Sequence, residues 1–257
     1  MRIVSLCPSV TELVFDLGCG ADLIGITRYC THPPAEVEAI EAIGGTKSPK
    51  IERIVELRPD VVLLNEEENR REDAEALAEA GVHCHVSFPR TIADTAAMVR
   101  SIGAELERRP ASEAIARDIE VRSERVRRAA AERAAVRWAY LIWRKPWMAA
   151  NSDTFIDALL SLAGGENVFG AVPERYPEIS AGELAAAEAD VILLATEPFP
   201  FAPEHLDELA TATGLPPERF RIVDGRLLSW HGSCTPAGID YAEEVILTTP
   251  SRAALPG

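Results

Sequence analysis

A continuous amphipathic pattern runs through the middle of the chain, from Pro110 to Arg133. No Gly or Pro interrupts the run after Pro110, and spacings of four, three and four residues place one set of positions on a single helical face: Ile115, Ile119, Arg122 and Val126. At about 1.5 Å per residue, such a helix spans roughly 36 Å. The pattern therefore predicts a long rigid helix over residues 110–134.

The segments on the two sides of this helix share one pattern. Each has a helix-like stretch, an aspartate (Asp60 or Asp190), a four-residue apolar run, and a glutamate seven positions after the aspartate. A short apolar run after a helix is typical of a buried parallel strand. The sequence predicts an α/β fold of two similar Rossmann-like lobes, residues 1–109 and 135–257, joined by the connecting helix. Ligands of open α/β sheets bind beyond the carboxyl ends of the strands, so we expect a ligand cleft between the lobes.

The first lobe is predicted to begin with a short strand, Ile3–Leu6, followed by a helix. Ser9 and Glu12 have the spacing of a capping box, so this helix is expected to start at Ser9 and to end before Gly18. The amide groups at its start could bind an anionic group, or Ser9 could simply cap them. At the other end of the chain, residues 248–257 have no hydrophobic pattern, and we expect a mobile tail.

Charge and composition exclude several classes of partner. The formal net charge is -15, which opposes general binding to nucleic acids and anionic membranes. Arginines of the connecting helix alternate with Asp and Glu, a pattern typical of a solvated helix face. No apolar run approaches the roughly 20 residues that cross a bilayer. Five cysteines, an odd number without metal-site spacing, favour reduced thiols.

The N-terminal residues lead directly into a strand, without the segments of a secretory signal. As written, the sequence predicts a cytoplasmic protein. A leader that had been trimmed, or a start codon assigned too late, would instead make the location periplasmic or the cell surface.

Aromatic residues at predicted strand ends are the main candidates for ligand contact. Trp143, Arg144 and Trp147 follow a strand in the second lobe, and two indole rings beside a cation can stack on a flat ligand. Tyr29 ends a strand of the first lobe, and Trp230 precedes His231. Metal binding by the protein itself is not predicted, because the Cys30–His32 and His83–His85 pairs each lack an evident third ligand.

The order of motifs along nearly the whole chain resembles the helical-backbone (class III) substrate-binding proteins of ABC transporters, which take up cobalamin, haem and iron siderophores. The motifs are "RIVSLCPSVTELVFDLG", "GITRYCTHPP", "GGTKSPKIERIVELRPDVVLL", "LAGGENVF", "ISAGEL" and "HGSCTPAGI". The chain looks most like the cobalamin-binding members. This resemblance implies a non-enzymatic binder of a bulky metal complex, with little closure around the ligand and no intrinsic cofactor.

The resemblance also implies roles for particular residues. The ligand-contacting set comprises Tyr29, Phe88, Trp143, Arg144, Trp147, Tyr176, Trp230 and His231. In the family, one acidic residue on each lobe pairs with arginines of the membrane permease. By position these would be Glu67 or Glu72 in the first lobe and Glu197 in the second. Arg144 would meet carboxylate, phosphate or catecholate groups of the ligand.

Three functions are compatible with these patterns. The leading hypothesis is the substrate-binding component of an ABC uptake system, or a leaderless relative that carries, stores or senses a corrinoid, haem or ferric siderophore. An enzyme acting on such a complex, a reductase or metal-inserting enzyme, would have Cys7 or Cys234 as its candidate thiol. A regulatory protein using the acidic surface is the third hypothesis. His231 is either an axial ligand to the metal or an ordinary hydrogen-bonding histidine.

Overall fold

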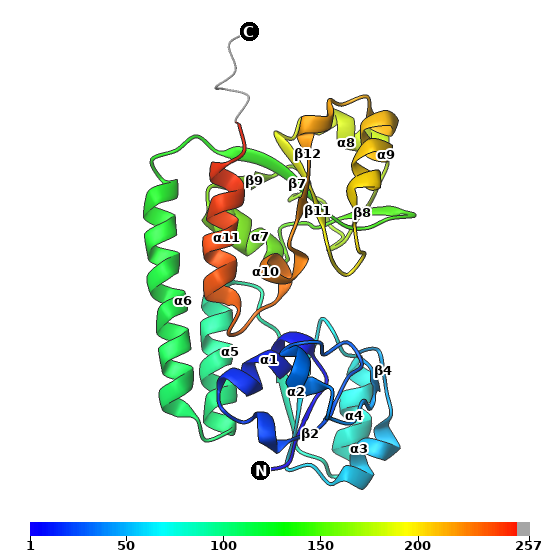
Figure 1. Ribbon diagram of the computed structural model, residues 1–257, viewed down its shortest axis with the longest axis vertical. Coiled ribbons are helices and arrows are strands. Elements are labelled where there is room, and N and C mark those ends of the chain that lie inside the picture. The colour runs from blue at the N-terminus through cyan, green and yellow to red at the C-terminus, as the bar shows by residue number, and fades with distance from the viewer. Residues whose placement is uncertain (251–257) are drawn as a thin grey trace. The chain divides into compact units, whose positions relative to one another are not determined.

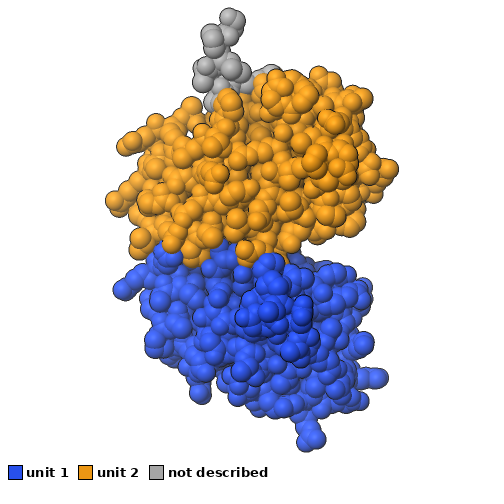
Figure 2. All heavy atoms as spheres, in the orientation of Figure 1, with its two compact units in different colours: residues 1–89, 93–120, 231–235 blue, residues 90–92, 121–230, 236–257 orange. Residues whose placement is uncertain are grey.

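Figure 1 shows the computed structural model, in which residues 1–250 are described. The chain forms two compact units, coloured separately in Figure 2. Unit 1 contains residues 1–89, 93–120 and 231–235, and unit 2 contains residues 90–92, 121–230 and the residues from 236 onward. Sequence reasoning had placed residues 231–235 in the second lobe. Most of the predicted tail, from residue 251, lies outside the described residues.

Unit 1 is built on a parallel four-stranded sheet of order β2-β1-β5-β6. Its strands are β1 (Ile3–Ser5), β2 (Leu23–Ile26), β5 (Val61–Asn65) and β6 (Cys84–Ser87), with a small hairpin of β3 (Gly44–Gly45) and β4 (Ser48–Pro49). Its helices are α1 (Pro8–Asp16), α2 (Pro34–Val37), α3 (Ile51–Leu57), α4 (Arg71–Glu79) and most of α5 (Ile92–Glu105). Side chains of α3 and α4 pack on one sheet face around Ile54 and Leu77, which are fully buried.

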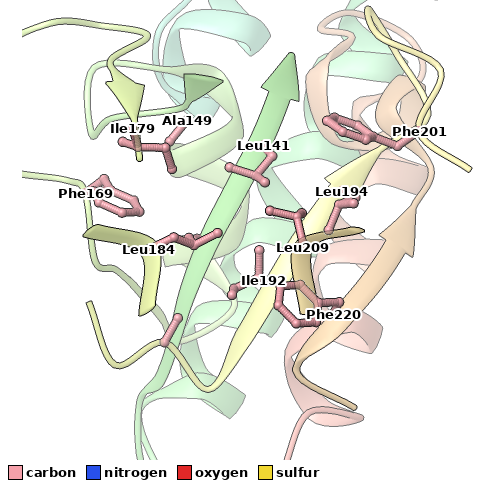
Figure 3. Packing of buried hydrophobic residues seen from close by; sticks show 12 residues of the cluster. Leu141, Ala149, Phe169, Ile179, Leu184, Ile192, Leu194, Phe201, Leu209 and Phe220 are labelled. Carbon is pink, nitrogen blue, oxygen red and sulfur yellow. The ribbon is translucent and has the colours of Figure 1, made fainter. Parts of the chain in front are cut away.

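Unit 2 has a sheet of order β10-β8-β7-β11-β12, with β9 paired to β7. The strands are β7 (Val136–Trp143), β8 (Trp147–Ala149), β9 (Gly165–Asn167), β10 (Glu178–Ile179), β11 (Val191–Ala195) and β12 (Phe220–Val223). The helices are α7 (Phe155–Leu162), α8 (Ala181–Ala186), α9 (Pro203–Thr213), α10 (Gly225–Ser229) and α11 (Thr235–Leu247), the last starting at the unit boundary. In Figure 3, Leu184 of α8 and Leu209 of α9 pack against Leu141 and Leu194 of the sheet.

The predicted connecting helix is α6 (Arg109–Ala130). Its buried positions are Ser112, Ala116, Ile119, Ser123 and Val126. Of the predicted face, Ile119 and Val126 are buried, Ile115 is half-buried, and Arg122 forms an ion pair with Asp240 of α11. In unit 1, Arg100 of α5 binds Glu113 and Glu120 of α6, and in unit 2 Arg125 binds Asp240 and Glu243. Each part of α6 is thus held to its own unit by charged contacts.

The two units also share equivalent hydrogen bonds. In unit 1, Asp60 accepts from the Arg2 backbone N–H at 2.7 Å, and the Arg2 guanidinium donates to the Leu57 carbonyl at 2.6 Å. In unit 2, Asp190 accepts from the Arg137 N–H at 2.9 Å, and Arg137 donates to the Ala187 carbonyl at 3.1 Å. The residue two positions before each aspartate has a positive φ, 47° at Arg58 and 54° at Glu188. The prediction of two similar α/β lobes is confirmed.

The start of the first helix differs from its prediction. α1 begins at Pro8, its N-cap is Cys7, and no side chain caps it. Proline at the first helical position needs no N–H partner, so the helix starts one residue before Ser9. The capping box of Ser9 and Glu12 was therefore wrong, and the Ser9 hydroxyl takes other partners, described below. A capping box does form in unit 2, where Ser180 and Glu183 cap α8.

Candidate functional site

Four aromatic rings and a histidine gather in unit 2 near the carboxyl ends of β7 and β11. This aromatic platform consists of Trp143, Trp147, Phe199, Phe201 and His205. Trp143 meets Phe199 edge-on at 5.7 Å between ring centroids, Trp147 stacks on Phe201 at 6.1 Å, and Phe199 meets Phe201 at 4.8 Å. Figure 3 shows Phe201 near the end of β11. Offset and edge-to-face contacts of this kind fix ring orientations.

The tryptophans reach the platform because β7 and β8 form an antiparallel pair, in which Trp143 lies opposite Met148. Trp143 is 42% exposed, although most large apolar side chains of unit 2 are buried. An exposed indole held in place by a second ring presents a preoriented flat surface. The platform can therefore stack on a planar or apolar face of a ligand.

Arg144 lies at the edge of the platform with its charge already paired. Its Nε and Nη2 donate to the same Glu208 oxygen at 2.8 and 2.7 Å, and its guanidinium carbon is 5.9 Å from the Trp147 ring centroid. The pair fixes the guanidinium beside Trp147. It also places a carboxylate next to the cation that the sequence suggested for anionic ligand groups.

A buried polar cluster occupies the carboxyl end of β1 in unit 1. His231 Nδ1 lies 3.1 Å from Ser9 Oγ, and His231 Nε2 lies 3.1 Å from Asn65 Nδ2. The Asn65 Oδ1 accepts the backbone N–H groups of Glu67 and Glu68, so the amide nitrogen faces the imidazole and donates to Nε2. This network assigns the proton to Nδ1, which donates to Ser9. Ser9 in turn lies 3.3 Å from the Cys7 thiol.

The cluster keeps its histidine neutral. Burial lowers the pKa of His231 from 6.5 to about 4, because the charged imidazolium would lose its hydration. Burial likewise raises the pKa of the Cys7 thiol to about 12. Both imidazole nitrogens have protein partners, an arrangement that supports the hydrogen-bonding interpretation of His231 over metal ligation.

Tyr29 lies at the end of β2 in unit 1 and is 51% exposed. The Arg28 Nη2 donates to the Tyr29 hydroxyl at 3.2 Å, and the guanidinium carbon is 5.0 Å from the ring centroid. The Arg28 backbone N–H donates to the Gly44 carbonyl at 2.9 Å. A Cβ atom on Gly45 would lie 3.2 Å from Arg28 Nη2 and 3.3 Å from Tyr29 Cε2, so a glycine there leaves room for both side chains.

The other predicted contact residues are dispersed within their units. Phe88 follows β6 and is half-buried, as is Tyr176 in the loop before β10. Trp230 is half-buried at the end of α10, where the Arg226 guanidinium lies 5.8 Å from its ring centroid. Of the predicted set, the structure brings together Trp143, Arg144 and Trp147.

The predicted docking carboxylates differ in exposure. Glu72 is exposed in the first turn of α4, and Glu67 is half-buried. The Glu67 backbone carbonyl accepts from Lys47 Nζ at 2.5 Å. Glu197 is half-buried, and its Cγ lies 2.7 Å from the position that a Cβ on Gly225 would occupy. The loop after β5 is ordered by its two asparagines, since Asn69 donates to the carbonyls of Leu6 and Thr46.

Sequence reasoning missed the platform's Phe199, Phe201 and His205, and the partner of Arg144, Glu208. The stretch "EPFPFAPEH" carries an available signal, since its two phenylalanines alternate with prolines directly after a buried strand. Among residues 1–250, no group of three or more His, Cys, Asp or Glu side chains could hold a metal ion. His83 and His85 instead bond Glu105 and Ser101. No helix in this range is long and apolar enough to span a membrane.

Comparisons with known proteins agree on one family. A vitamin B12-binding protein of Pectobacterium carotovorum subsp. carotovorum is 25% identical over 199 residues, 77% of this chain and 72% of that protein. The periplasmic vitamin B12-binding protein BtuF of Vibrio cholerae has a similar fold, with a TM-score of 0.85, 20% identity, and coverage of 96% of this chain and 97% of BtuF. The periplasmic heme-binding protein RhuT from Roseiflexus sp. RS-1 gives 0.82 with 23% identity, covering 96% of each chain.

The family model named "Periplasmic binding protein" matches residues 3–215, which include all of β1 through α9. That range holds the sheets of both units except β12, together with the aromatic platform. The chain is therefore a member of the periplasmic binding protein family, a binding protein rather than an enzyme.

Proposed function

We propose that this protein binds a corrinoid, of which cobalamin is the leading example, as the substrate-binding component of an ABC uptake system. The observation that carries the proposal is the aromatic platform, whose exposed Trp143 and stacked Trp147 suit a large ring system with apolar faces. Vitamin B12-binding relatives in sequence and in fold support the corrinoid class. Heme-binding proteins of similar fold make haem the competing ligand.

Titration of the purified chain followed by tryptophan fluorescence tests this function. The ligand panel is cyanocobalamin, dicyanocobinamide, haemin and a ferric siderophore, with free N-acetyltryptophanamide titrated in parallel to correct for absorption by the coloured ligands. Saturable quenching by the two corrinoids, at lower concentrations than by haemin, is the expected result. Saturable quenching by haemin alone would contradict the corrinoid proposal and identify haem as the ligand.

Variants connect the binding to the platform. Trp147→Ala removes the ring that stacks on Phe201, and truncation of a central aromatic contact typically weakens binding by about 2 kcal/mol or more, roughly thirtyfold. Trp138→Phe is the matched control, because Trp138 is fully buried near the start of β7, five residues before Trp143 of the platform. Calorimetric titration gives both affinities without relying on fluorescence. Equal affinities for the two variants would contradict the assignment of the platform.

The proposed partner is an ABC permease that recognises surface carboxylates. In unit 1 the exposure of Glu72 favours it over the half-buried Glu67, and Glu197 is the proposed residue of unit 2. Alanine substitution of Glu72 or Glu197 is expected to reduce ligand-stimulated ATP hydrolysis by the reconstituted cognate permease while leaving ligand affinity intact. Unchanged stimulation in both variants would remove these residues from the interface.

The proposed function places the protein outside the cytoplasmic membrane, where the named relatives BtuF and RhuT are described as periplasmic. The sequence as written predicted the cytoplasm instead. Fractionation of the native host, with an antibody against the chain and markers for each compartment, decides between the two locations.

A further inference from the structure

His205 of the aromatic platform lies in the first turn of α9, and several contacts within unit 2 fix its ring. The imidazole meets Phe199 at 5.3 Å and Phe201 at 5.5 Å between ring centroids, with interplanar angles of 78° and 89°. Both phenylalanines are tied to the sheet. The Phe199 N–H donates to the Ile142 carbonyl of β7 at 3.4 Å. The Phe201 N–H donates to the Ala195 carbonyl at the end of β11, also at 3.4 Å.

A hydrogen bond from the helix start determines which imidazole nitrogen carries the proton. The Nδ1 of His205 lies 2.9 Å from the backbone nitrogen of Ala202, the N-cap residue, and 3.2 Å from its carbonyl oxygen. That carbonyl already accepts the His205 backbone N–H at 2.9 Å, whereas the Ala202 N–H can only donate and has Nδ1 as its acceptor. Nδ1 is therefore the acceptor, and the neutral ring carries its proton on Nε2.

The protonated Nε2 has no acceptor in the protein. In the described part of the chain, residues 1–250, no hydrogen bond is made to Nε2, and it is not one of the buried polar atoms that lack a partner. Its N–H is therefore open to water. Phe199 links this donor to the exposed Trp143, which it meets at 5.7 Å. Because a protonated nitrogen offers no lone pair to a metal, this tautomer favours a hydrogen bond over axial ligation.

We propose that His205 is a specificity-determining residue, whose Nε2–H donates a hydrogen bond to an oxygen acceptor at the edge of a ring ligand stacked on the platform. This inference rests on the proposed function and deepens it. The acceptor is a carbonyl or carboxylate oxygen, which a corrinoid carries in its peripheral amides and haem in its propionates. A ring held only by stacking can rotate in its own plane. A directional hydrogen bond at its edge selects one orientation and disfavours rings without an acceptor.

Two substitutions separate the hydrogen bond from the ring contacts. His205→Gln removes the ring, but its amide oxygen can accept the Ala202 N–H, as at the third position of a capping box, while its amide nitrogen still donates. His205→Phe keeps an aromatic ring and has no donor. Calorimetric titration with cyanocobalamin should give about a tenfold loss of affinity in His205→Phe and less than about threefold in His205→Gln. The reverse order would assign His205 a packing role and overturn the inference.

His205→Glu is the matched control for the helix start. Its carboxylate accepts the Ala202 N–H as the Gln amide does but, when ionised, cannot donate. We expect its cyanocobalamin affinity to fall as in His205→Phe, which would show that the loss does not come from an uncapped α9. Affinity equal to that of His205→Gln would contradict the donor role. Circular dichroism and thermal unfolding of each variant establish that the fold is retained.

Nitrogen-15 NMR of histidine-labelled protein tests the tautomer directly. The signals of His205 are those that disappear from the spectrum in His205→Gln. At a pH where the ring is neutral, we expect the proton on Nε2, and the Nε2 signal should shift when cyanocobalamin is added. A proton on Nδ1, or an Nε2 signal that saturating ligand leaves unchanged, would overturn the inference.

The inference and the proposed function fail in different ways. Equal cyanocobalamin affinities in the unmodified chain and all three variants overturn the role of His205 and leave corrinoid binding in place. If the chain binds haemin instead, the order of His205→Gln and His205→Phe is measured with haemin, whose propionates supply the acceptor. An imidazole-ligated absorption spectrum of bound haemin that is lost in His205→Gln would show metal ligation and overturn the donor role. Absence of binding to every ligand overturns both proposals.

Discussion

His231 shows how one side chain can join residues far apart in the sequence without any charge. Its imidazole bridges Ser9 and Asn65, which are 222 and 166 positions away. All three side chains are buried, so each hydrogen bond forms in a low-dielectric environment where an unpaired partner would be costly. The bridge requires neutral imidazole, since a protonated Nε2 could no longer accept from the Asn65 amide.

This requirement predicts an acid-sensitive contribution to stability. The pKa of His231 is lowered from 6.5 in the unfolded chain to about 4 in the folded chain, so the unfolded state binds more protons between these pH values. The contribution is present above pH 6.5 and is lost as pH falls toward 4. It amounts to about 3 kcal/mol of unfolding free energy.

Urea unfolding at several pH values between 4 and 7 measures this contribution. His231→Gln removes the titrating group, so the variant should lose less stability than the unmodified chain over the same range. His83→Gln, at an exposed histidine, controls for the loss of a histidine as such. Parallel pH profiles for the unmodified chain and His231→Gln would contradict the prediction.

At the scale of elements, the two units use the same arginine–aspartate arrangement to join a helix to the strand that follows it. An arginine at the start of β1 or β7 binds the last carbonyls of α3 or α8, and an aspartate before β5 or β11 accepts that arginine's N–H. The environments differ, however. Asp190 is buried and lies 3.8 Å from Arg219, whereas Asp60 is exposed.

This difference predicts unequal costs for the same substitution. Asp190→Ala removes a buried carboxylate and leaves the half-buried Arg137 N–H without its acceptor, which should lower the unfolding free energy by about 2 kcal/mol. Asp60→Ala leaves the Arg2 N–H to bind water instead, so the unfolding free energy should fall by less than about 1 kcal/mol. Urea unfolding of the two variants, each compared with the unmodified chain, measures both values. An equal or larger loss of unfolding free energy in Asp60→Ala would show that burial of the aspartate does not determine how much this arrangement stabilises the fold.

The elements that sequence reasoning predicted are those specified by local patterns. The apolar runs of β5 and β11 and the periodicity of α6 depend on neighbouring residues alone. The errors arose where distant residues decide the outcome. The Ser9 hydroxyl binds His231, 222 positions away, and Arg144 is paired with Glu208, 64 positions away. The start of α1 is the exception, because it depends on the neighbouring Pro8. Phe199 and Phe201 join the tryptophans through the arrangement of strands, which no single motif encodes.

For the whole molecule, the net charge of -15 affects how ligands arrive. A surface of this sign attracts cations and repels anions over roughly one Debye length, about 10 Å at 0.1 M salt. The charge of a ligand should therefore change its association rate constant more than it changes its affinity.

Aquacobalamin and cyanocobalamin test this effect, because the first carries one more positive charge on the same corrin. The ratio of their association rate constants, aquacobalamin over cyanocobalamin, should exceed one at about 10 mM salt and decline as salt is raised to about 0.5 M. Stopped-flow fluorescence measures both rates. A ratio that does not change with salt would show that the two ligands differ through direct contacts instead.

The packing of residues 231–235 into unit 1 affects how the protein is made. A ribosome synthesises Ser9 and Asn65 early, but it adds His231 only after all of unit 2 that precedes α11. During translation the N-terminal unit therefore lacks the buried His231, Cys234 and Thr235, and the groups that His231 would bind stay open to water or to chaperones. A transcript that ends before codon 231 would yield a protein incomplete in both units, even though the whole first sheet would be present.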